Sequence, residues 1–575
     1  MTDTPREHDH STAESFVARL GERGIEYVFA NAGTDFASII EALARKPASN
    51  RKYPTFITVP HENVAVAMAH GYYRVSGKPA AVMVHVTVGT ANTVCGLMNA
   101  ARDNIPVLLA AGRTPLTETG HAASRSRPIH WGQEMFDQGG LVRELVKWDF
   151  ELRGGQPVAS VVDRALDIAM SEPRGPVYLT LPREVLADPA TPPRRDTVRP
   201  LGAHAPVPAP AAVEQAARIL AEAAFPLIIT SAAGRMPEAM AALAALAEEF
   251  AIPVVQTEST DISLPTDHPM CFGFDAAPFI DRADAIAVFD SAVPWMPRFH
   301  HLKADARVVW FGTDPLFARY PFREHEADQL VTGDTGAALT MLRDSLAALA
   351  KTRKGAIKAR RTALAKTREA MIERRRKAIE RITDQTPVHP LYLAHCVNEL
   401  KAKDAIVVSE LGVPAAGLDL TVPRSWLSSS LAGGLGWGLG AALGAKLAAP
   451  DREVIASVGD GSYYFGNPLA YHFLGRAEKL PTLTIIHNNQ AWHAVRQATR
   501  EVYPGGHAER ANAMPLVELS PAPDFEMVAQ SCGGHGEKVT SSRELMPALE
   551  RAFAAVRSGT PALVNVATQN RGAPT

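Results

Sequence analysis

The chain has 575 residues, more than one hydrophobic core normally supports, and at about 100 to 200 residues per domain it predicts three domains. It carries 59 Lys and Arg against 61 Asp and Glu, so a formal net charge of −2 provides no basic field for nucleic acid or an anionic membrane and favours a small-molecule partner. Its four cysteines are far apart and form no CxxC pair, which argues against a disulfide framework or a zinc site and fits a reducing compartment.

The N-terminal region predicts a first α/β domain, to which we assign residues 1–188. Residues 1–12 are polar without an apolar run, so we expect no signal or transit peptide and a cytoplasmic location. Short apolar strands then alternate with helical patterns, with strands expected at 27–30, 55–59, 80–86, 107–111 and 177–181. Such alternation predicts a doubly wound parallel sheet.

A second α/β set follows a proline-rich linker at 191–211, and we assign residues 189–349 to this central domain. Strands are expected at 226–230, 253–256, 285–289 and 307–311. The segment 231–235 contains only one glycine, so we predict no flavin-binding loop here. Residues 350–387, rich in Lys, Arg, Ala and Glu, predict a helical connector whose charge forms a solvated face rather than a nucleic-acid site.

Residues 388–575 predict a third α/β domain that ends with a strand at 562–566. Within it, residues 425–445 carry no charge and could be mistaken for a membrane span. Six glycines between Gly433 and Gly444 favour a buried loop and helix instead. The glycine spacing also fails to match a dinucleotide-binding fingerprint, which disfavours an NAD-dependent dehydrogenase.

The most informative stretch of this third domain is SVGDGSYYFGNPLAYHFLGRAEKLPTLTIIHNNQ, residues 457–490. An apolar strand at 453–458 leads into Gly459, Asp460, Gly461 and Ser462, where we expect a tight turn whose backbone N–H groups can approach a diphosphate. One helix and a return strand at 482–487 lead to Asn489. Because the crossover makes the two strands parallel neighbours, Asp460 and Asn489 should meet at one sheet edge.

Oxygen ligands at that edge predict a site for Mg2+. The Asp460 carboxylate, the Asn489 amide and a backbone carbonyl, expected at Ala491, form half of the oxygen shell that Mg2+ or Ca2+ requires. Diphosphate and water would supply the rest. An Asp-Gly turn followed by an ordinary Asn-Asn turn is the structural alternative.

In the first domain, Glu62 follows a strand and opens a helix with a buried face, in the sequence HENVAVAMAHGYYRVSGKPA. A glutamate in the first turn of a helix is often there only because it interacts favourably with the helix dipole. Its context resembles the helix that bears the catalytic glutamate in the thiamine-diphosphate-dependent acetolactate synthase, pyruvate decarboxylase and benzoylformate decarboxylase superfamily. The GDG and Asn-Asn motifs, the loop ANAGT at 30–34, the stretch HVTVGTAN at 85–92 and LAGGLG at 431–436 resemble the same family in the same order.

This resemblance covers residues from about 14 to 568 and implies three α/β domains, for binding the pyrimidine, for the central fold and for binding the diphosphate. It also implies thiamine diphosphate and Mg2+ as cofactors, and a homodimer or homotetramer with active sites between subunits. Glu62 would hydrogen-bond the pyrimidine and promote loss of the C2 proton. Further cofactor contacts would come from Leu435 under the bent cofactor, the Gly433 carbonyl, Gly461 and Ser462, and backbone N–H groups of Gly412 and Val413.

His85 separates the branches of this family. The acetolactate synthases lack a histidine at this position, whereas H-x-x-x-G-T-x-N is similar to benzoylformate decarboxylase, where the histidine acts on intermediates; a structural strand-end histidine is the alternative reading. Thr34 matches a serine that contacts the substrate carboxylate. Ala32 replaces the usual proline, and Trp295 stands where that decarboxylase has a second histidine. Asn31, Trp295, Trp492 and His493 are pocket candidates, although such aromatics are often core residues, and the pair at 300–301 is expected on the surface.

The sequence therefore predicts a thiamine-diphosphate- and Mg-dependent 2-oxo acid decarboxylase or C–C lyase and carboligase. Its partner would be a small molecule, a 2-oxo acid or an acyloin, and we expect no nucleic-acid or membrane partners. An acetolactate-synthase-like transferase that condenses two 2-oxo acids is the alternative. A non-catalytic family member acting as a binding or regulatory subunit is a remote one, because Glu62, Asp460 and Asn489 are all present.

Overall fold

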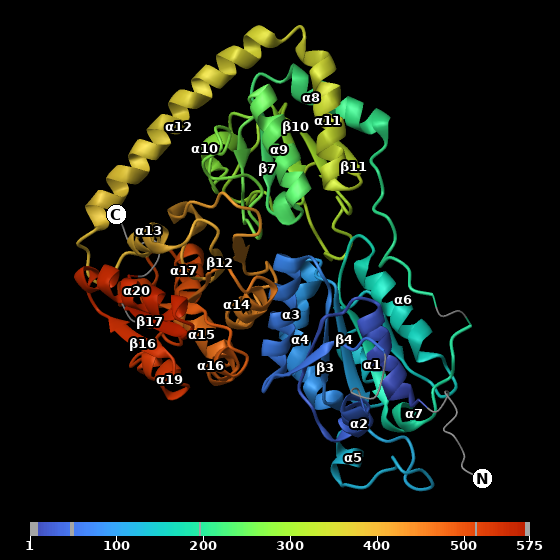
Figure 1. The fold of residues 1–575 in the computed structure, drawn as a ribbon. Helices are drawn as coiled ribbons and strands as arrows, with labels where there is room; N and C mark the ends of the chain where they lie inside the picture. The colour runs from blue at the N-terminus through green and yellow to red at the C-terminus, as the bar shows by residue number, and fades with distance from the viewer. Residues whose placement is uncertain (1–9, 46–50, 195–196, 512–513, 570–575) are drawn as a thin grey trace. The chain divides into compact units, whose positions relative to one another are not determined.

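The computed structural model describes residues 10–45, 51–194, 197–511 and 514–569, and the chain divides into two compact units. Unit 1 takes in residues 1–204, 429–451 and 462–480, and unit 2 takes in 205–428, 452–461 and 481–575. These units contain three parallel sheets, whose strands alternate with helices along the chain (Figure 1). The fold class predicted from the alternation of strands and helices is confirmed.

Unit 1 contains a six-stranded parallel sheet. Its strands, in spatial order, are β2 (Thr55–Thr58), β1 (Tyr27–Ala30), β3 (Ala80–Val84), β4 (Val107–Arg113), β6 (Val177–Pro182) and β5 (Asp149–Glu151). Its longer helices are α1 (Thr12–Glu22), α2 (Ala37–Arg45), α3 (Glu62–Ser76), α4 (Val86–Arg102), α6 (Val158–Met170), α14 (Trp437–Ala448) and α16 (Pro468–Ala477). Strand β5 was not expected, because its three residues are half-buried and form no apolar run.

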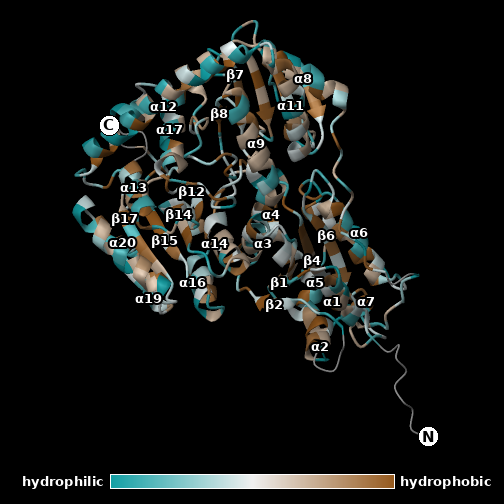
Figure 2. Ribbon diagram, turned by 45° about the horizontal axis from the view of Figure 1, so that its top comes forward, coloured by the Kyte–Doolittle hydropathy of each residue, from teal (hydrophilic) through white to brown (hydrophobic). Residues whose placement is uncertain are grey.

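Two parallel sheets belong to unit 2. The five-stranded sheet has the order β11 (Gln329–Thr332), β10 (Arg307–Gly312), β9 (Ala285–Phe289), β7 (Pro226–Thr230) and β8 (Val254–Val255). The six-stranded sheet has the order β13 (Trp426–Ser428), β12 (Ile406–Glu410), β14 (Val454–Gly459), β15 (Leu483–Asn488), β17 (Ala562–Ala567) and β16 (His535–Val539). Figure 2 shows that the central strands are mostly hydrophobic, as expected for strands buried on both faces.

Helix α12 (Lys354–Ile382) is formed by the basic segment that follows α11 (Thr335–Ala350). It is mostly hydrophilic in Figure 2, and Leu364 and Ile382 are its buried residues. Arg360 donates to the carbonyl oxygens of Phe250 and Ala251, at 2.8 and 2.9 Å, at the C-terminus of α9 (Pro237–Phe250). Arg360 of α12 therefore caps the C-terminus of α9, which gives this basic residue a structural role.

The glycine-rich stretch after β13 forms a loop and then α14, which packs against α3 within unit 1. A Cβ added to Gly71 would lie 2.0 Å from the carbonyl oxygen of Ala441, and one added to Gly444 would lie 2.0 Å from that of Met68. Glycine thus lets the two helix backbones approach closely. The expected buried helix is confirmed, and none of the helices in the described part of the chain combines the length and apolar character needed to cross a membrane.

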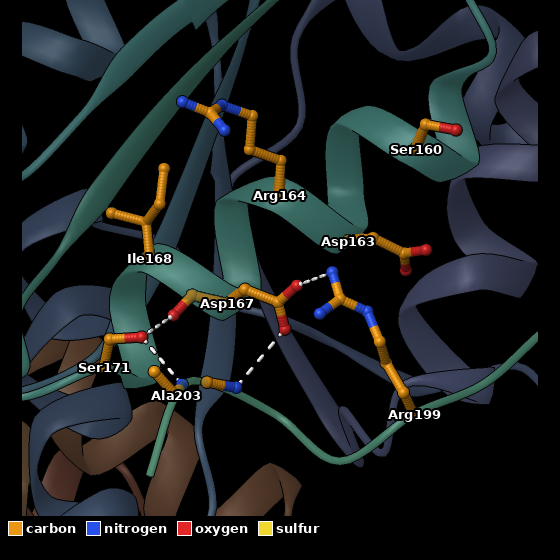
Figure 3. Close-up of a pocket in the computed structure, with 9 residues that line it drawn as sticks. Ser160, Asp163, Arg164, Asp167, Ile168, Ser171, Arg199 and Ala203 are labelled. Atoms are coloured by element: carbon orange, nitrogen blue, oxygen red, sulfur yellow. Dashed lines mark hydrogen bonds and ion pairs between the residues drawn. The ribbon is translucent and has the colours of Figure 1, made fainter. Parts of the chain in front are cut away.

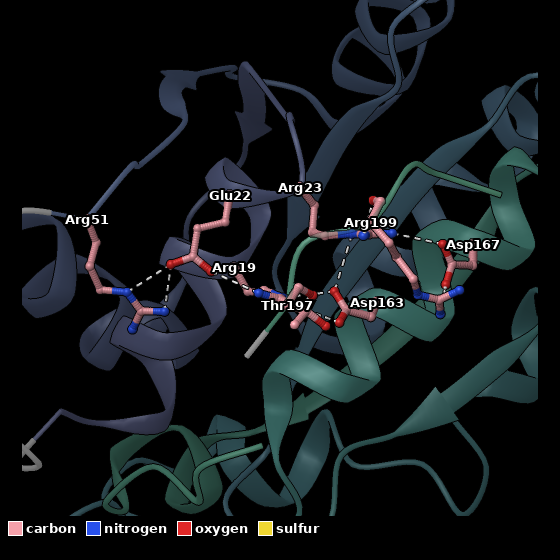
Figure 4. A network of polar contacts seen from close by, with 8 residues as sticks. All are labelled: Arg19, Glu22, Arg23, Arg51, Asp163, Asp167, Thr197 and Arg199. Atoms are coloured by element: carbon pink, nitrogen blue, oxygen red, sulfur yellow. Dashed lines mark hydrogen bonds and ion pairs between the residues drawn. The ribbon is translucent and has the colours of Figure 1, made fainter. Parts of the chain in front are cut away.

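The segment that leaves the first sheet is held on α6 by a network of arginines and aspartates (Figure 4). Arg19 forms two hydrogen bonds to Asp163, at 2.7 and 2.8 Å, and one to the carbonyl oxygen of Thr197 at 3.1 Å. Arg23 pairs with Asp167 at 2.8 Å, and Arg199 pairs with the same carboxylate. The side chains of Arg19 and Arg23 are fully buried, so these pairs connect α1, α6 and the linker.

A cavity of about 450 Å3 lies between α6 and this linker (Figure 3). Its carboxylates already bind arginines, and the hydroxyl of Ser171 donates to the Asp167 carbonyl while accepting the N–H of Ala203 at 2.9 Å. The polar groups of this cavity are thus used to attach the linker.

Candidate active site

Glu62 is the first residue of α3, and only 8% of it is exposed. The preceding residue, His61, caps the helix, since its Nδ1 accepts the N–H of Asn63 at 3.2 Å. From the neighbouring helix α4, the Asn92 amide donates to Oε2 of Glu62 at 3.0 Å. A Cβ on Gly89 of the same helix would lie 3.4 Å from Oε1. The carboxylate is therefore buried and held at the junction of two helices.

His85 lies near Glu62 but not on a strand, so the expectation of a strand reaching residue 86 is wrong. Strand β3 ends at Val84, and His85 is the N-cap of α4 because the backbone turns at Val86, where φ is +32°. This φ is unusual for a β-branched residue, and such outliers concentrate at functional sites. The turn places the imidazole at the carboxyl end of the sheet.

Asp35 binds His85 although 50 residues separate them. Its Oδ1 lies 2.5 Å from Nδ1 of the imidazole, and its Oδ2 accepts the N–H of Val86 at 3.4 Å. On the other side of the ring, Nε2 lies 3.2 Å from the amide nitrogen of Gln133. The hydrogen bond from the ring to Asp35 raises the pKa of His85 above its ordinary value of 6.5, although burial of the ring opposes it.

Two glycines make room for this pair. A Cβ on Gly33 would lie 2.0 Å from Nδ1 of His85, and one on Gly112 would lie 1.8 Å from Oδ2 of Asp35. Any side chain at either position would displace the imidazole or the carboxylate. The strand order β1, β3, β4 brings the ends of these three strands together, and each contributes to the cradle.

Thr34 is exposed and lies beside a second histidine that the sequence analysis missed. Its hydroxyl is 3.4 Å from Nε2 of His130, which is buried in the short helix α5 (Ile129–Gly132). The Nδ1 of His130 accepts the N–H of Ser126 at 3.1 Å, so Nε2 carries the proton of the neutral ring. Burial lowers the pKa of His130, as do the neighbouring Arg183, Arg127 and Arg125, so the two histidines are shifted in opposite directions.

Asn31, another pocket candidate, occupies the same loop with its side chain directed at the backbone. Its amide nitrogen donates to the carbonyl oxygen of Val59 at 2.9 Å, which ties the ends of β1 and β2 together. We therefore assign Asn31 a structural contact.

The GDG motif follows β14 in unit 2 as expected, and β14 pairs in parallel with β15. The expected tight turn is wrong, because helix α15 (Asp460–Phe465) begins at Asp460 directly after the strand. Oδ1 of Asp460 accepts the N–H of Gly461 at 2.8 Å, and Oδ2 accepts that of Gln490 at 2.7 Å. Burial raises the pKa of Asp460 to about 6, although the backbone hydrogen bonds to its carboxylate act to lower the pKa.

Asn489 and Ala491 lie in the loop that follows β15 and receives Asp460. Oδ1 of Asn489 accepts the N–H of Ala491 at 3.0 Å, and the Ala491 carbonyl accepts that of His493 at 2.8 Å. Each of these oxygens keeps a second lone pair for a cation. Among the described residues no three His, Cys, Asp or Glu side chains cluster as metal ligands, and the expected set contains only one carboxylate.

Gly461 and Ser462 lie in the first turn of α15. The hydroxyl oxygen of Ser462 is buried and has no hydrogen-bond partner in the described structure, which is costly without a ligand. A Cβ on Gly461 would lie 2.2 Å from the ring of Trp492, so the indole covers the start of α15. His493 is the first residue of the neighbouring helix α17 (His493–Val502), and both side chains are half-buried.

Gly412 and Val413 follow β12 in unit 2. A Cβ on Gly412 would lie 2.1 Å from the carbonyl oxygen of Ser457, which explains the glycine. The N–H of Val413 donates to the Ser457 hydroxyl at 2.9 Å, and Val413 is 1% exposed. That N–H is occupied inside the protein, which corrects the expectation that it faces a diphosphate.

Gly433 and Leu435 lie in the loop before α14 in unit 1. Gly433 is exposed with φ of +66°, and Leu435 is half-buried. Between them, Gly434 is held by Asn99, whose amide donates to its carbonyl at 2.7 Å and accepts its N–H at 3.1 Å. The loop is thus fixed by α4, the helix that also holds Glu62.

Trp295 is buried in the core of the central sheet, which corrects its assignment to a substrate pocket. Its ring packs against Trp310 and His325, at centroid distances of 6.2 and 5.3 Å. His301 is exposed and His300 accepts the N–H of Met296, so this pair has the expected surface character.

Three family models match the chain. They are the thiamine pyrophosphate enzyme N-terminal TPP binding domain over residues 10–141, the central domain over 213–342 and the C-terminal TPP binding domain over 412–566. A probable acetolactate synthase of Mycobacterium bovis is 28% identical over 99% of this chain and 97% of its own length. A benzoylformate decarboxylase of Pseudomonas aeruginosa is 28% identical over 96% of this chain and 97% of its own.

A solved structure shows the same fold. The thiamine diphosphate-dependent 4-hydroxybenzoylformate decarboxylase of Rhodococcus jostii matches with a TM-score of 0.75 and 24% identity, over 98% of this chain and 100% of its own.

Proposed function

Because the chain belongs to the thiamine pyrophosphate enzyme family, we propose that it is a thiamine-diphosphate- and Mg-dependent 2-oxo acid decarboxylase or C–C lyase and carboligase. The observation that carries the proposal is the His85 imidazole, bound by Asp35 and placed in the same unit as the buried Glu62. An imidazole with a raised pKa can protonate a carbon or oxygen of the reacting substrate near neutral pH.

The residues present fit the two cofactors. The partnerless hydroxyl of Ser462 and the N-terminus of α15 suit a diphosphate oxygen, and the oxygens of Asp460, Asn489 and Ala491 suit Mg2+. The Trp492 ring packs directly against Gly461, so no side chain fits at this position beside the start of α15. When bound, thiamine diphosphate supplies the carbanion chemistry that amino-acid side chains lack.

The protein's own residues would position the cofactor and transfer protons to and from the reacting groups. Glu62, bonded on one oxygen by Asn92, would hydrogen-bond the pyrimidine with the other and promote loss of the C2 proton. The Gly433 carbonyl and the Leu435 side chain would contact the cofactor from a loop held by Asn99. Gly412 stays a candidate phosphate contact, whereas we leave out Val413 because its N–H is occupied.

For the substrate we propose a small or aromatic 2-oxo acid, or an acyloin. Thr34 has an exposed hydroxyl and receives the neutral Nε2–H of His130, so its own proton is free to bind a carboxylate. Trp492 and His493 are half-buried and remain candidate substrate contacts. We further propose a cytoplasmic homodimer or homotetramer in which the active site forms between subunits.

An acetolactate-synthase-like transferase is the second candidate, since an acetolactate synthase is among the relatives that match over nearly their whole length. Glu62 and the cofactor-binding residues would serve both reactions, whereas a catalytic role for His85 would favour the decarboxylase or lyase. The products formed from one or two 2-oxo acids distinguish the two. A non-catalytic subunit is disfavoured because Glu62 and Asp460 are both buried, an arrangement that costs stability without a function.

The decisive experiment incubates the purified protein, reconstituted with thiamine diphosphate and Mg2+, with single 2-oxo acids, pairs of 2-oxo acids and acyloins. Mass spectrometry then identifies the products, and thiochrome analysis measures bound cofactor. An aldehyde or acyloin with loss of one carboxyl group supports the proposal. A 2-hydroxy-2-acyl acid from two 2-oxo acids would favour the transferase, and a lack of bound cofactor would reject both.

A further inference from the structure

We propose that Asp35 and Gln133 are positioning residues for His85: Asp35 holds Nδ1 and directs proton exchange to Nε2, and Gln133 satisfies Nε2 whether or not it carries a proton. Neither residue was among those expected from the sequence. This inference rests on the proposed function, in which His85 moves a proton during turnover.

The geometry of Asp35 is that of an orienting carboxylate. It is 3% exposed, and its two oxygens bind the His85 ring and the backbone N–H of the following residue, Val86. It therefore fixes the imidazole and the start of α4 together. Because the carboxylate only accepts hydrogen bonds, Nδ1 must carry a proton, and Nε2 becomes the nitrogen that gains and loses one.

Gln133 can serve Nε2 in both states. Its amide nitrogen lies 3.2 Å from Nε2 and donates to the neutral ring. Its oxygen is buried and has no hydrogen-bond partner in the described structure. A half-turn of the amide would let that oxygen accept Nε2–H of the imidazolium, so one residue supports the ring before and after it gives up its proton.

The surroundings of the ring favour the cation. Asp35 and, at longer range, Glu62 attract it, and burial lowers the pKa of His130, which disfavours a second cation. The cradle of Gly33 and Gly112 fits the pair so closely that a longer carboxylate would not be accommodated at position 35. Asp35→Glu is therefore no rescue, and Asp35→Asn is the informative change.

The test measures the pKa of His85 and that of His130 separately in the cofactor-free protein. Hydrogen–deuterium exchange at the imidazole carbon between the nitrogens, followed by trypsin and mass spectrometry over a pH series, yields the pKa of each histidine. Trypsin releases His85 in residues 75–102 and His130 in 126–143, and each peptide contains one histidine. We expect His85 to titrate above 6.5 and His130 below it.

In Asp35→Asn, the pKa of His85 should fall by at least about one unit, whereas that of His130 should move little. The matched control is Asp188→Asn, which removes the carboxylate bound to His121 at 3.1 Å and should leave His85 unchanged. A pKa of His85 below 6.5 in the wild type would overturn the inference. The same pKa of His85 in the wild type and in Asp35→Asn would also overturn it. These readings need no turnover, so they stand apart from failure of the proposed function.

Activity then shows whether Asp35 acts through His85. Asp35→Asn should lower kcat by about 10- to 1,000-fold in the wild-type background and by less than about threefold in a His85→Gln background. Equal losses in both backgrounds would mean that Asp35 only supports the fold. Gln133→Leu should shift the pH dependence of kcat with a smaller loss, and an unchanged pH profile would remove Gln133 from the proposal.

Discussion

The Oδ2 atom of Asp460 accepts the backbone N–H of Gln490 at 2.7 Å, which joins the tips of the adjacent parallel strands β14 and β15. Gln490 adopts a φ of +53°, a conformation that L residues rarely take. The contact places Asp460 next to the loop that carries Asn489 and Ala491, whose oxygens we propose as magnesium ligands.

Asp460→Ala should weaken binding of thiamine diphosphate in the presence of Mg2+ by more than about tenfold, because a hard cation loses its only carboxylate. Isothermal titration calorimetry measures this directly. Asp451→Ala, an exposed aspartate before the same strand, is the control. Unchanged cofactor affinity in Asp460→Ala would remove the metal assignment.

Glu62→Gln should nearly abolish hydrogen–deuterium exchange at C2 of the bound cofactor, because an amide keeps the shape but cannot share a proton with the pyrimidine. NMR after acid quench follows the exchange. Glu238→Gln changes an exposed first-turn glutamate of α9 and should have no effect. If Glu62→Gln shows the wild-type exchange rate, Glu62 has no catalytic role and only interacts favourably with the helix dipole.

His85→Ala should lower turnover by about 100- to 10,000-fold, the usual contribution of a general acid, while C2 exchange continues. Steady-state kinetics and the exchange assay are run on the same preparation. His301→Ala, on the surface, serves as control. Turnover within about threefold of wild type would make His85 structural and favour the acetolactate-synthase-like alternative.

Asp163→Asn should destabilise the protein by about 3 kcal/mol, because it deprives the buried Arg19 and Arg23 of a shared partner. Urea unfolding compares the variant with Asp137→Asn, which disrupts an exposed pair with Arg143 and should change stability little. The kcat should be unaffected in both. Equal stability of the two variants would contradict a role for the network in attaching the linker.

His472 should make stability depend on pH. Burial lowers its pKa to about 4, and its Nε2 lies 2.9 Å from the Tyr463 hydroxyl. Between pH 6.5 and 4 the unfolded chain binds the proton more readily, so stability should fall as the pH drops through this window, by up to about 3 kcal/mol. His472→Gln keeps an acceptor for Tyr463 but does not titrate, so its melting temperature should depend less on pH. Parallel curves for both proteins would refute this.

Sequence patterns located most strands to within one or two residues, because a strand buried on both faces is a run of apolar residues and its turns are local. The sequence did not predict strands β5, β11, β13 and β16. Strands β5 and β13 have only three residues, and most residues of β11 and β16 are not buried, so none of the four forms a long apolar run. The start of α15 at Asp460 and the end of β3 at Val84 were also misjudged. Backbone direction at such junctions depends on hydrogen bonds to distant loops, such as those of Asp460 to Gln490 and of Asp35 to Val86.

By itself, the sequence determined the three α/β sheets and the motifs around Glu62 and Asp460, because both depend on residues close together in the chain. Only the tertiary structure decided that Asp35 binds His85, that His130 lies beside Thr34, that Trp295 is a core residue and that the N–H of Val413 is occupied. The first two facts follow from the order of strands β1, β3 and β4 and from the side chains that meet near their ends. The other two follow from packing in the central sheet and in the sheet that contains β12 and β14. No local pattern carries that information, because partners such as Val413 and Ser457, Asp35 and His85, and Thr34 and His130 are 44 to 96 residues apart and meet only after the sheets have formed.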